Sequence, residues 1–225
     1  ALHGPQVDGR RVILFCFIDD HSRLLAGYRW AAREDVLNAS RALRAGMAAR
    51  GRPRAVYVDN GSPFVSGQLL RACAVLGIRL IHSRPGRPEG RGKIERVFRT
   101  IRDQVLVELE DHPPASLEEL NRTFQAWVES VYHQREHSET GQTPLERFLA
   151  WGPPPLVSEL ALSEAFRWSE ARTVSQTGTV SMHGNIYEVD PGLAGRRVEL
   201  VFDPFELAEI DSLCGVLFKD FQASN

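Results

Sequence analysis

The chain has 225 residues, of which 43% are hydrophobic and 25% charged, a composition that fits one sizeable core, or one domain with a small appendage. No apolar run approaches the roughly 20 residues that cross a bilayer, so we expect no membrane partner. Cys16, Cys73 and Cys214 are scattered through apolar runs, which predicts core thiols in a reducing compartment and neither a disulfide framework nor a zinc site.

The net charge of −2 argues weakly against a nucleic-acid partner, but its distribution along the chain argues for one. The net charge is +5 over residues 1–54, +1 over 55–83 and +5 over 84–102, and then −9 over 103–170 and −4 over 171–225. A basic front and an acidic remainder are typical of a chain with one phosphate-facing surface, although charge alone does not exclude a chance asymmetry.

The front half reads as alternating strands and helices. Residues 11–18 are almost continuously apolar, which predicts a buried central strand, and residues 24–31 follow as its hairpin partner. Residues 35–50 carry the period of a helix that ends at Gly51, and residues 54–59 form a short apolar strand that ends in an aspartate.

The middle of the chain continues this alternation. Ser66 is a suitable N-cap for a helix closed by Gly77, and residues 78–81 predict a further strand. A loop rich in Pro and Gly follows, and then three helical segments, for which we expect the ranges 93–109, 117–132 and 144–151.

The character of the sequence changes after the three prolines at 153–155. We expect a connecting segment there and, beyond it, short strands split by turn residues, at 172–174, 179–182, 186–189 and 197–202. The fold class is therefore α/β, and the order of its elements is that of a ribonuclease-H-like core with a small C-terminal β-barrel. We assign the core to residues 1–152, the connecting segment to 153–170 and the barrel to 171–225.

Residues 82–102 stand out for their chemistry. Glu95 lies at the start of the helix that follows the loop, and Arg99 and Arg102 lie three or four residues apart on its polar face. An isolated glutamate on such a face is usually only a solvated charge. A second carboxylate, Asp59, ends a strand upstream with 35 residues between it and Glu95.

Two carboxylates from separate elements can converge on a hard divalent cation such as Mg²⁺, which prefers oxygen ligands and keeps positions open for water and phosphate. Two such ions about 3.5–4 Å apart would assist an in-line phosphoryl transfer. No G-x-x-x-x-G-K loop occurs, so the sequence does not support an ATPase.

Four segments resemble insertion-sequence transposases of the retroviral-integrase superfamily, and a fifth resembles phage Mu-type transposases. The segments 17–23 (FIDDHSR), 57–64 (YVDNGSPF) and 90–96 (GRGKIER) resemble their catalytic core, and 132–147 resembles the part that closes that core. Residues 182–198, with MHGNIYEV and LAGRRV, resemble the C-terminal barrel of phage Mu-type transposases.

The resemblance implies a D,D,E metal site in which Asp59 is the second acid and Glu95 the third, with Mg²⁺ or Mn²⁺ as the cofactor. By the same resemblance the first acid falls one residue before Ala1. Asp19 also ends a strand and is the alternative, although the resemblance places it in a D-x-x-S-R turn, where it would order the backbone and pair with Arg23.

The function that the resemblance implies is metal-dependent cleavage and strand transfer of double-stranded DNA by a homo-oligomer in the bacterial cytoplasm, associated with the nucleoid when bound. Two alternatives are a catalytically inactive DNA-binding remnant that lacks the first aspartate and a plain metal-dependent nuclease. The residues expected to hold DNA phosphates are Arg84, Arg91, Lys93, Arg96, Arg99 and Arg102.

Overall fold

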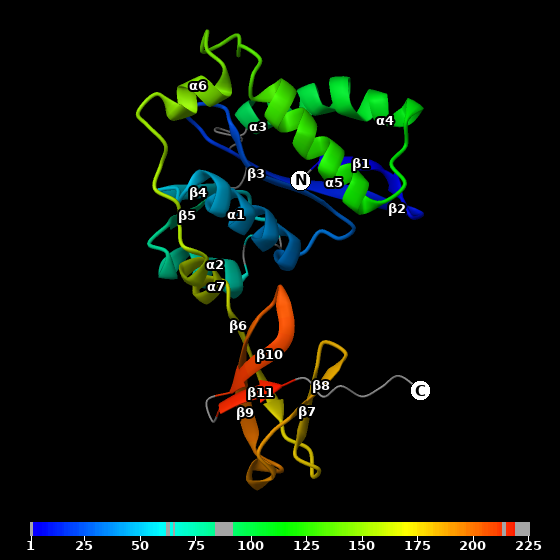
Figure 1. Cartoon of the computed structure of the whole chain (residues 1–225), viewed down its shortest axis with the longest axis vertical. Helices are drawn as coiled ribbons and strands as arrows, with labels where there is room; N and C mark the ends of the chain where they lie inside the picture. The colour runs from blue at the N-terminus through cyan, green and yellow to red at the C-terminus, as the bar shows by residue number, and fades with distance from the viewer. Residues whose placement is uncertain (1, 62–63, 65, 84–91, 213–214, 219–225) are drawn as a thin grey trace. The chain divides into compact units, whose positions relative to one another are not determined.

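The computed structural model describes residues 2–61, 64, 66–83, 92–212 and 215–218, and the chain falls into two compact units, residues 1–162 and 163–225. The first unit combines sheets with helices and the second consists mainly of strands (Figure 1). The expected α/β class is confirmed.

An antiparallel sheet opens the first unit. Its strands are β1 (Leu2–Val7), β2 (Arg10–Ile18) and β3 (Leu25–Ala31), in the order β1-β2-β3. Both faces of β2 are covered, which explains its nearly continuous apolar sequence: Val12 and Leu14 join the main core, whereas Phe15 packs with small residues of the next helix.

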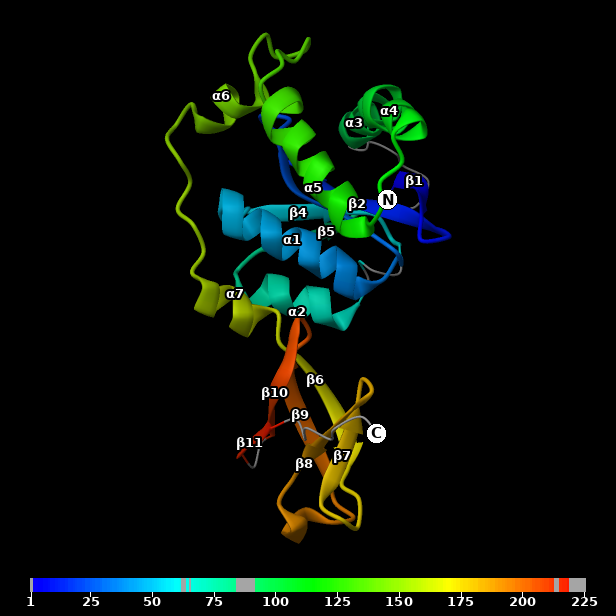
Figure 2. The ribbon, with the colours of Figure 1, turned by 45° about the vertical axis from the view of Figure 1, so that its right-hand side comes forward.

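Helix α1 (Val36–Arg50) packs on β3 and β2 and is capped by Asp35, whose carboxylate accepts a hydrogen bond from Asn38 N. Beyond it lie β4 (Ala55–Val58), α2 (Gly67–Val75) and β5 (Arg79–His82). The two strands pair in parallel, so their carboxyl ends lie side by side (Figure 2).

The other face of the antiparallel sheet is covered by a helical layer. Its elements are α3 (Gly92–Ile101), the π turn η2 (Arg102–Leu106), α4 (Val107–Asp111), α5 (Leu117–Trp127) and the π turn η3 (Val128–Tyr132). The two predicted helices are thus present, but each contains a wider turn that we did not predict.

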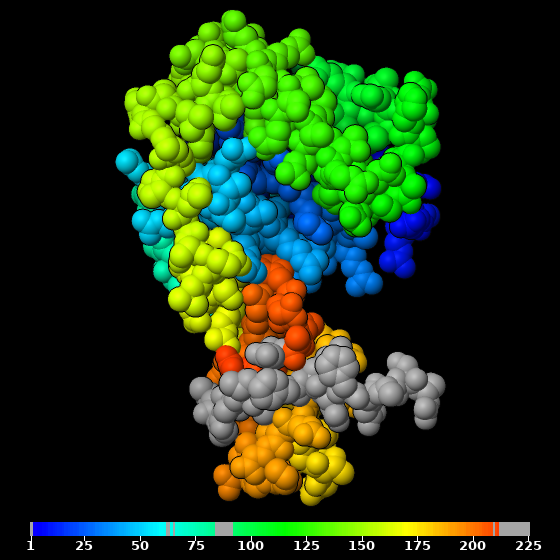
Figure 3. Space-filling model, in the orientation of Figure 1, coloured from blue at the N-terminus to red at the C-terminus, as the bar shows by residue number. Residues whose placement is uncertain are grey.

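Helix α6 (Pro144–Leu149) starts with a capping box between Thr143 and Glu146. The chain then runs over the surface of the first unit (Figure 3) to α7 (Glu159–Ala165), and Glu159 forms an ion pair with Arg44 of α1. The predicted connecting segment therefore includes a helix. Among the described residues, no helix is both long and apolar enough to cross a membrane.

The second unit contains a four-stranded antiparallel sheet in the order β11-β10-β9-β6 and a separate hairpin of β7 and β8, around one core that includes Tyr187, Leu200 and Phe202. Strands β10 and β11 lie beyond the last strand that we predicted. The elements are β6 (Trp168–Thr173), β7 (Thr179–Met182), β8 (Asn185–Glu188), the 3₁₀ turn η4 (Pro191–Leu193), β9 (Arg197–Asp203), β10 (Glu206–Ser212) and β11 (Gly215–Phe218).

Candidate metal and nucleic-acid site

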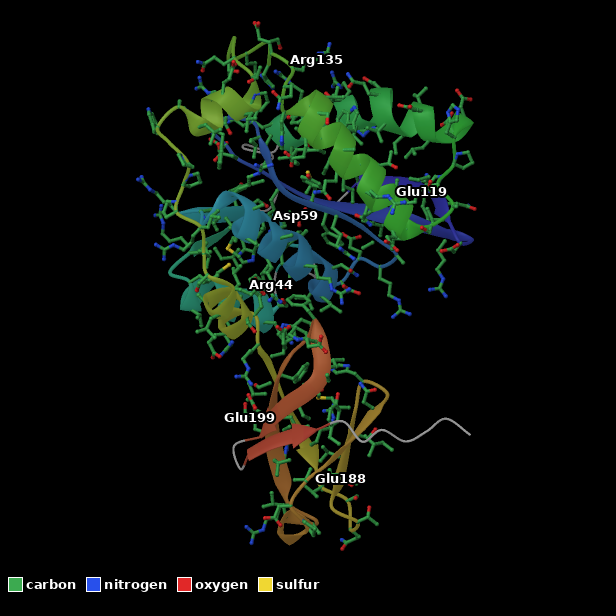
Figure 4. All side chains as sticks on the ribbon, viewed as in Figure 1. Arg44, Asp59, Glu119, Arg135, Glu188 and Glu199 are labelled. Atoms are coloured by element: carbon green, nitrogen blue, oxygen red, sulfur yellow. The ribbon has the colours of Figure 1, made fainter. Side chains whose placement is uncertain are left out.

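The strand β4 places Asp59 at its carboxyl end, as expected. The side chain, labelled in Figure 4, is partly exposed, and its Oδ1 accepts a hydrogen bond from Gly61 N at 2.9 Å. This short-range bond fixes one carboxylate oxygen in the turn that follows the strand.

The turn after Asp59 is anchored on two sides. The ring of Phe64 meets that of Phe17 of β2 edge to face, with centroids 6.3 Å apart. Asn60 Nδ2 donates to Ser83 O at 3.0 Å, and a ring nitrogen of His82 lies 3.0 Å from Phe64 O. These contacts tie Asp59 to the ends of both β2 and β5.

Helix α3 presents Glu95 in its first turn. The glutamate is exposed and makes no hydrogen bond or ion pair among the residues that the structure describes. Two residues earlier, Lys93 Nζ reaches the β2–β3 turn, where it lies 2.5 Å from Asp20 Oδ1 and 3.3 Å from Asp20 O. Ile94 packs against the main core and so holds α3 in place.

Both candidate acids are therefore supported from the same end of β2. The loop of Asp59 is held by Phe17 near that end, and the helix of Glu95 is held by Asp20 just beyond it. Two segments that are far apart in sequence thus contact residues near or just beyond the same end of β2.

Asp19 is committed to the turn. Its Oδ2 accepts hydrogen bonds from Ser22 N at 2.8 Å and from Ser22 Oγ at 2.6 Å. The expected pairing of Asp19 with the Arg23 side chain is wrong, because Arg23 contacts Asp19 through its backbone N–H, while its guanidinium lies 3.8 Å from Glu139.

The six residues expected to hold phosphates differ in their surroundings. Arg84 and Arg91 lie outside the described residues. Lys93 pairs with Asp20, and Arg96 pairs with Glu139. Arg99 and Arg102 are exposed, and the described part of the chain gives neither of them an ion pair.

The part of the chain that we expected to close the core also holds the β2–β3 turn, which the sequence did not reveal. Tyr132 Oη donates to Arg23 O at 3.0 Å, and Arg147 Nε donates to His21 O at 2.9 Å. Leu25 N donates to His133 Nε2 at 3.1 Å. The only sequence signal for this role was the resemblance over residues 132–147.

A partly buried polar network links β3, α1 and η3 near this turn. Glu129 accepts hydrogen bonds from Arg50 at 2.6 Å and from Tyr28 Oη at 2.9 Å, and it lies 3.2 Å from His133 Nδ1. Burial opposes the ionisation of Glu129, yet the hydrogen bonds from Arg50 and Tyr28 hold the pKa of its carboxyl below the ordinary 4.5. Burial lowers the pKa of His133 below 6.5, so its neutral form is favoured.

The chemistry of Asp59 and Glu95 suits a hard divalent cation. Both offer carboxylate oxygens, which such ions prefer, and both side chains are accessible to solvent. Within the described ranges, no group of three or more His, Cys, Asp or Glu side chains is placed to hold a metal ion.

Two family models described as Integrase core domain match residues 1–88 and 76–144, and the model described as Mu transposase, C-terminal matches residues 164–211. The chain is 29% identical over 152 residues to the transposase for transposon Tn552 of Staphylococcus aureus. The aligned region covers 60% of this chain and 32% of that protein. It is 34% identical over 101 residues to an uncharacterized 39.2 kDa protein of insertion element IS476 of Xanthomonas euvesicatoria, which covers 45% of this chain and 28% of that protein. The chain thus spans about a third of the length of the curated relatives it matches.

Solved structures show the same fold at low identity. A chain of the simian T-cell lymphotropic virus intasome, in complex with PP2A regulatory subunit B56 gamma, matches with a TM-score of 0.58 and 17% identity, over 98% of this chain and 77% of that one. The HTLV-2 integrase catalytic core domain in complex with magnesium matches with a TM-score of 0.53 and 18% identity, over 65% and 90%. The expected ribonuclease-H-like fold of the core is confirmed by these neighbours.

Proposed function

Because this chain belongs to the integrase core family and carries a Mu transposase C-terminal domain behind that core, we propose that it cuts and joins DNA by metal-dependent phosphoryl transfer. The single observation that carries the proposal is the occurrence of both domains in one chain, in this order. Two accessible carboxylates, Asp59 after β4 and Glu95 in the first turn of α3, support it, because phosphoryl transfer needs acidic ligands for divalent ions.

The proposed reaction has two displacements at phosphorus. In the first, the oxygen of water attacks a phosphodiester and the bond to the 3′ oxygen breaks, which leaves a 3′-hydroxyl and a 5′-phosphate. In the second, that 3′-hydroxyl attacks a phosphodiester of the target DNA, joins to its phosphorus and releases a target 3′-hydroxyl.

The residues of this chain have distinct parts in the proposal. Asp59 and Glu95 would hold the divalent ion, Mg²⁺ or Mn²⁺, which supplies activation of the attacking oxygen and neutralisation of the charge that develops on the leaving oxygen. Arg99 and Arg102 are exposed and would bind backbone phosphates, so that the strand is oriented before reaction. Lys93 and Arg96, on the same helix, would join them once their carboxylate partners are displaced.

The partners follow from the reaction. Two element ends and a target must be held together, so we propose that the protein acts on double-stranded DNA as a homo-oligomer. We further propose that it works in the bacterial cytoplasm and associates with the nucleoid through DNA.

The test is Glu95→Gln in a longer protein with an aspartate directly before Ala1, assayed for cleavage and strand transfer on the ends of its own element. The amide keeps the shape and removes the charge, so we expect both activities to fall by several orders of magnitude, while circular dichroism stays unchanged. Glu110→Gln, an exposed position of α4, should retain activity. Near-normal turnover by a folded Glu95→Gln protein removes Glu95 from the site. Cleavage without joining by the parent identifies a nuclease, and binding without either reaction identifies an inactive DNA-binding remnant.

A further inference from the structure

Two of the basic side chains that we expect to bind DNA already form ion pairs with carboxylates from other parts of the first unit. Arg96 pairs with Glu139, which lies in the loop between η3 and α6, and Lys93 pairs with Asp20 in the β2–β3 turn. Arg99 and Arg102, further along the same helix, have no such pair in the described part of the chain.

The position of Glu139 is well defined. Thr140 N and Gly141 N both donate to His137 O at 2.9 Å, and Glu139 N lies 3.3 Å from His137 Nδ1, so a local turn presents the glutamate. Its two oxygens contact different arginines, one that of α3 and the other Arg23, at 3.8 Å. A carboxylate between two guanidinium groups carries the same single negative charge as a backbone phosphate, and arginine pairs with both kinds of group.

Both ion pairs are weak enough for a DNA phosphate to replace the carboxylate. Glu139 is 43% exposed and Arg96 51% exposed, and Asp20 is 85% exposed. Exposed ion pairs contribute little to stability, because water screens them and two long side chains must be ordered. A DNA phosphate in a continuous backbone competes well against such a partner, because it is positioned by its neighbours along the strand.

We propose that Glu139 and Asp20 are autoinhibitory residues that occupy the phosphate positions on Arg96 and Lys93 until DNA displaces them. Each binding event then includes the loss of two ion pairs, and this loss weakens binding to every DNA by a similar factor. The inference rests on the proposed function, because it assumes that α3 faces DNA.

The experiment measures binding of the 225-residue chain to a fluorescently labelled duplex of unrelated sequence. Glu139→Gln should raise the affinity about two- to fivefold, the range expected for release of an exposed ion pair. Glu136→Gln is the matched control, since it makes the same charge change three residues away, at an exposed position without an ion pair among the described residues. Glu136→Gln should raise the affinity by a clearly smaller factor than Glu139→Gln.

A double-mutant cycle separates competition from a general effect of charge. Arg96→Ala should weaken binding, and Glu139→Gln should lose most of its gain in the Arg96→Ala background, because the cation that it releases is gone. Asp20→Asn should behave in the same way with Lys93→Ala. Circular dichroism checks that each variant is folded.

The outcomes distinguish the two proposals. If Arg96→Ala and Lys93→Ala both bind as well as the parent, the DNA-facing assignment of α3 fails and the present inference fails with it. If these two variants bind weakly, but the gain from Glu139→Gln equals that from Glu136→Gln or persists in full without Arg96, only the present inference is overturned.

Discussion

At the scale of single residues, the exposed arginines of α3 and η2 give the most direct test of the phosphate-facing surface. We expect the double variant Arg99→Ala and Arg102→Ala to bind all duplexes more weakly by a similar factor, because phosphate contacts carry no sequence information. The slope of log affinity against log salt concentration should shrink by about one unit per lost contact. Binding measured across a salt series on two unrelated duplexes checks this, and an unchanged slope would mean that this face points away from DNA.

The network of Glu129 and His133 predicts how stability depends on pH. Both pKa values are lower in the folded chain than the ordinary 4.5 and 6.5, so the unfolded chain binds more protons in these ranges. Stability should therefore fall as the pH drops below 6.5, where the unfolded chain protonates this histidine first, and fall again below 4.5.

Urea unfolding at about pH 7.5 and about pH 5.5 measures the histidine part of this effect. His133→Gln should lower stability at the higher pH, since its bonds to Leu25 and Glu129 are altered, and should reduce the difference between the two conditions. The exposed variant His112→Gln should keep the parent's pH dependence. An undiminished dependence in His133→Gln would assign the effect to other groups.

At the scale of elements, the contact between α1 and β3 depends on two glycines. A Cβ on Gly27 would lie 2.4 Å from Ala42 O, and one on Gly46 would lie 2.9 Å from both Ala26 O and Gly27 Cα. Helix and strand approach through their backbones here, so neither residue has room for a side chain.

We therefore expect Gly27→Ala to destabilise the chain by about 1–3 kcal/mol or more, the range for an overpacked core, because the obstructing atoms belong to the backbone of α1. Gly67→Ala, at the start of α2, meets nothing within 4 Å and should be neutral or mildly stabilising. Thermal unfolding of both variants compares them, and equal midpoints would contradict the close approach of α1 and β3.

The π turns show which part of the fold the sequence determines and which part it leaves open. Periodicity predicted both long helices, because the buried residues repeat along each one. In α5 and η3 they are Leu120, Phe124, Val128 and Tyr132, always four apart. Four residues overshoot a turn of an ideal α-helix by about 40°, so this stripe would drift around the helix. The wider π turn η3 rotates the later buried residues back toward the sheet. From the sequence, the same regular spacing had predicted an ordinary α-helix.

Strand β1 was missed for a different reason. Its sequence contains Gly4 and Pro5, both poor strand formers, and among the described strands it pairs with β2 alone. Tertiary packing determines which residue fits in this strand. A Cβ on Gly4 would lie 2.2 Å from the ring of Trp30, so the buried indole requires glycine there. Such a requirement depends on a residue 26 positions away and is invisible to any local pattern.

The candidate site was predicted to a similar extent. The strand-end position of Asp59 and the helix-start position of Glu95 follow from local patterns, and the structure bears out both elements. The pairing of Arg96 with Glu139 and of Lys93 with Asp20 joins segments that are 43 and 73 residues apart, respectively. Local periodicity contains no information on such contacts, so only the three-dimensional arrangement reveals them.

At the scale of the whole molecule, we expect the number of acids to decide whether a protein of these 225 residues can react with DNA. A three-acid site balances one or two divalent ions with three carboxylates, and the resemblance assigns only Asp59 and Glu95 within this chain. Mg²⁺ binds few protein ligands and dehydrates reluctantly, so the loss of one carboxylate has a large effect on occupancy. Asp19 is a poor substitute, because two hydrogen bonds from Ser22 already hold its Oδ2.

We therefore predict that the 225-residue chain folds and binds DNA but neither cuts nor joins it, whereas a longer protein with an aspartate directly before Ala1 does both when Mg²⁺ is present. Strand transfer on the element's own ends, measured for the two proteins side by side, is the assay. Asp19→Asn in the longer protein should leave most of the activity, since Asp19 only orders the β2–β3 turn, and Asp59→Asn should abolish it. If the 225-residue chain is active and Asp19→Asn abolishes that activity, Asp19 is the first acid and the turn at the end of β2 is itself part of the metal site.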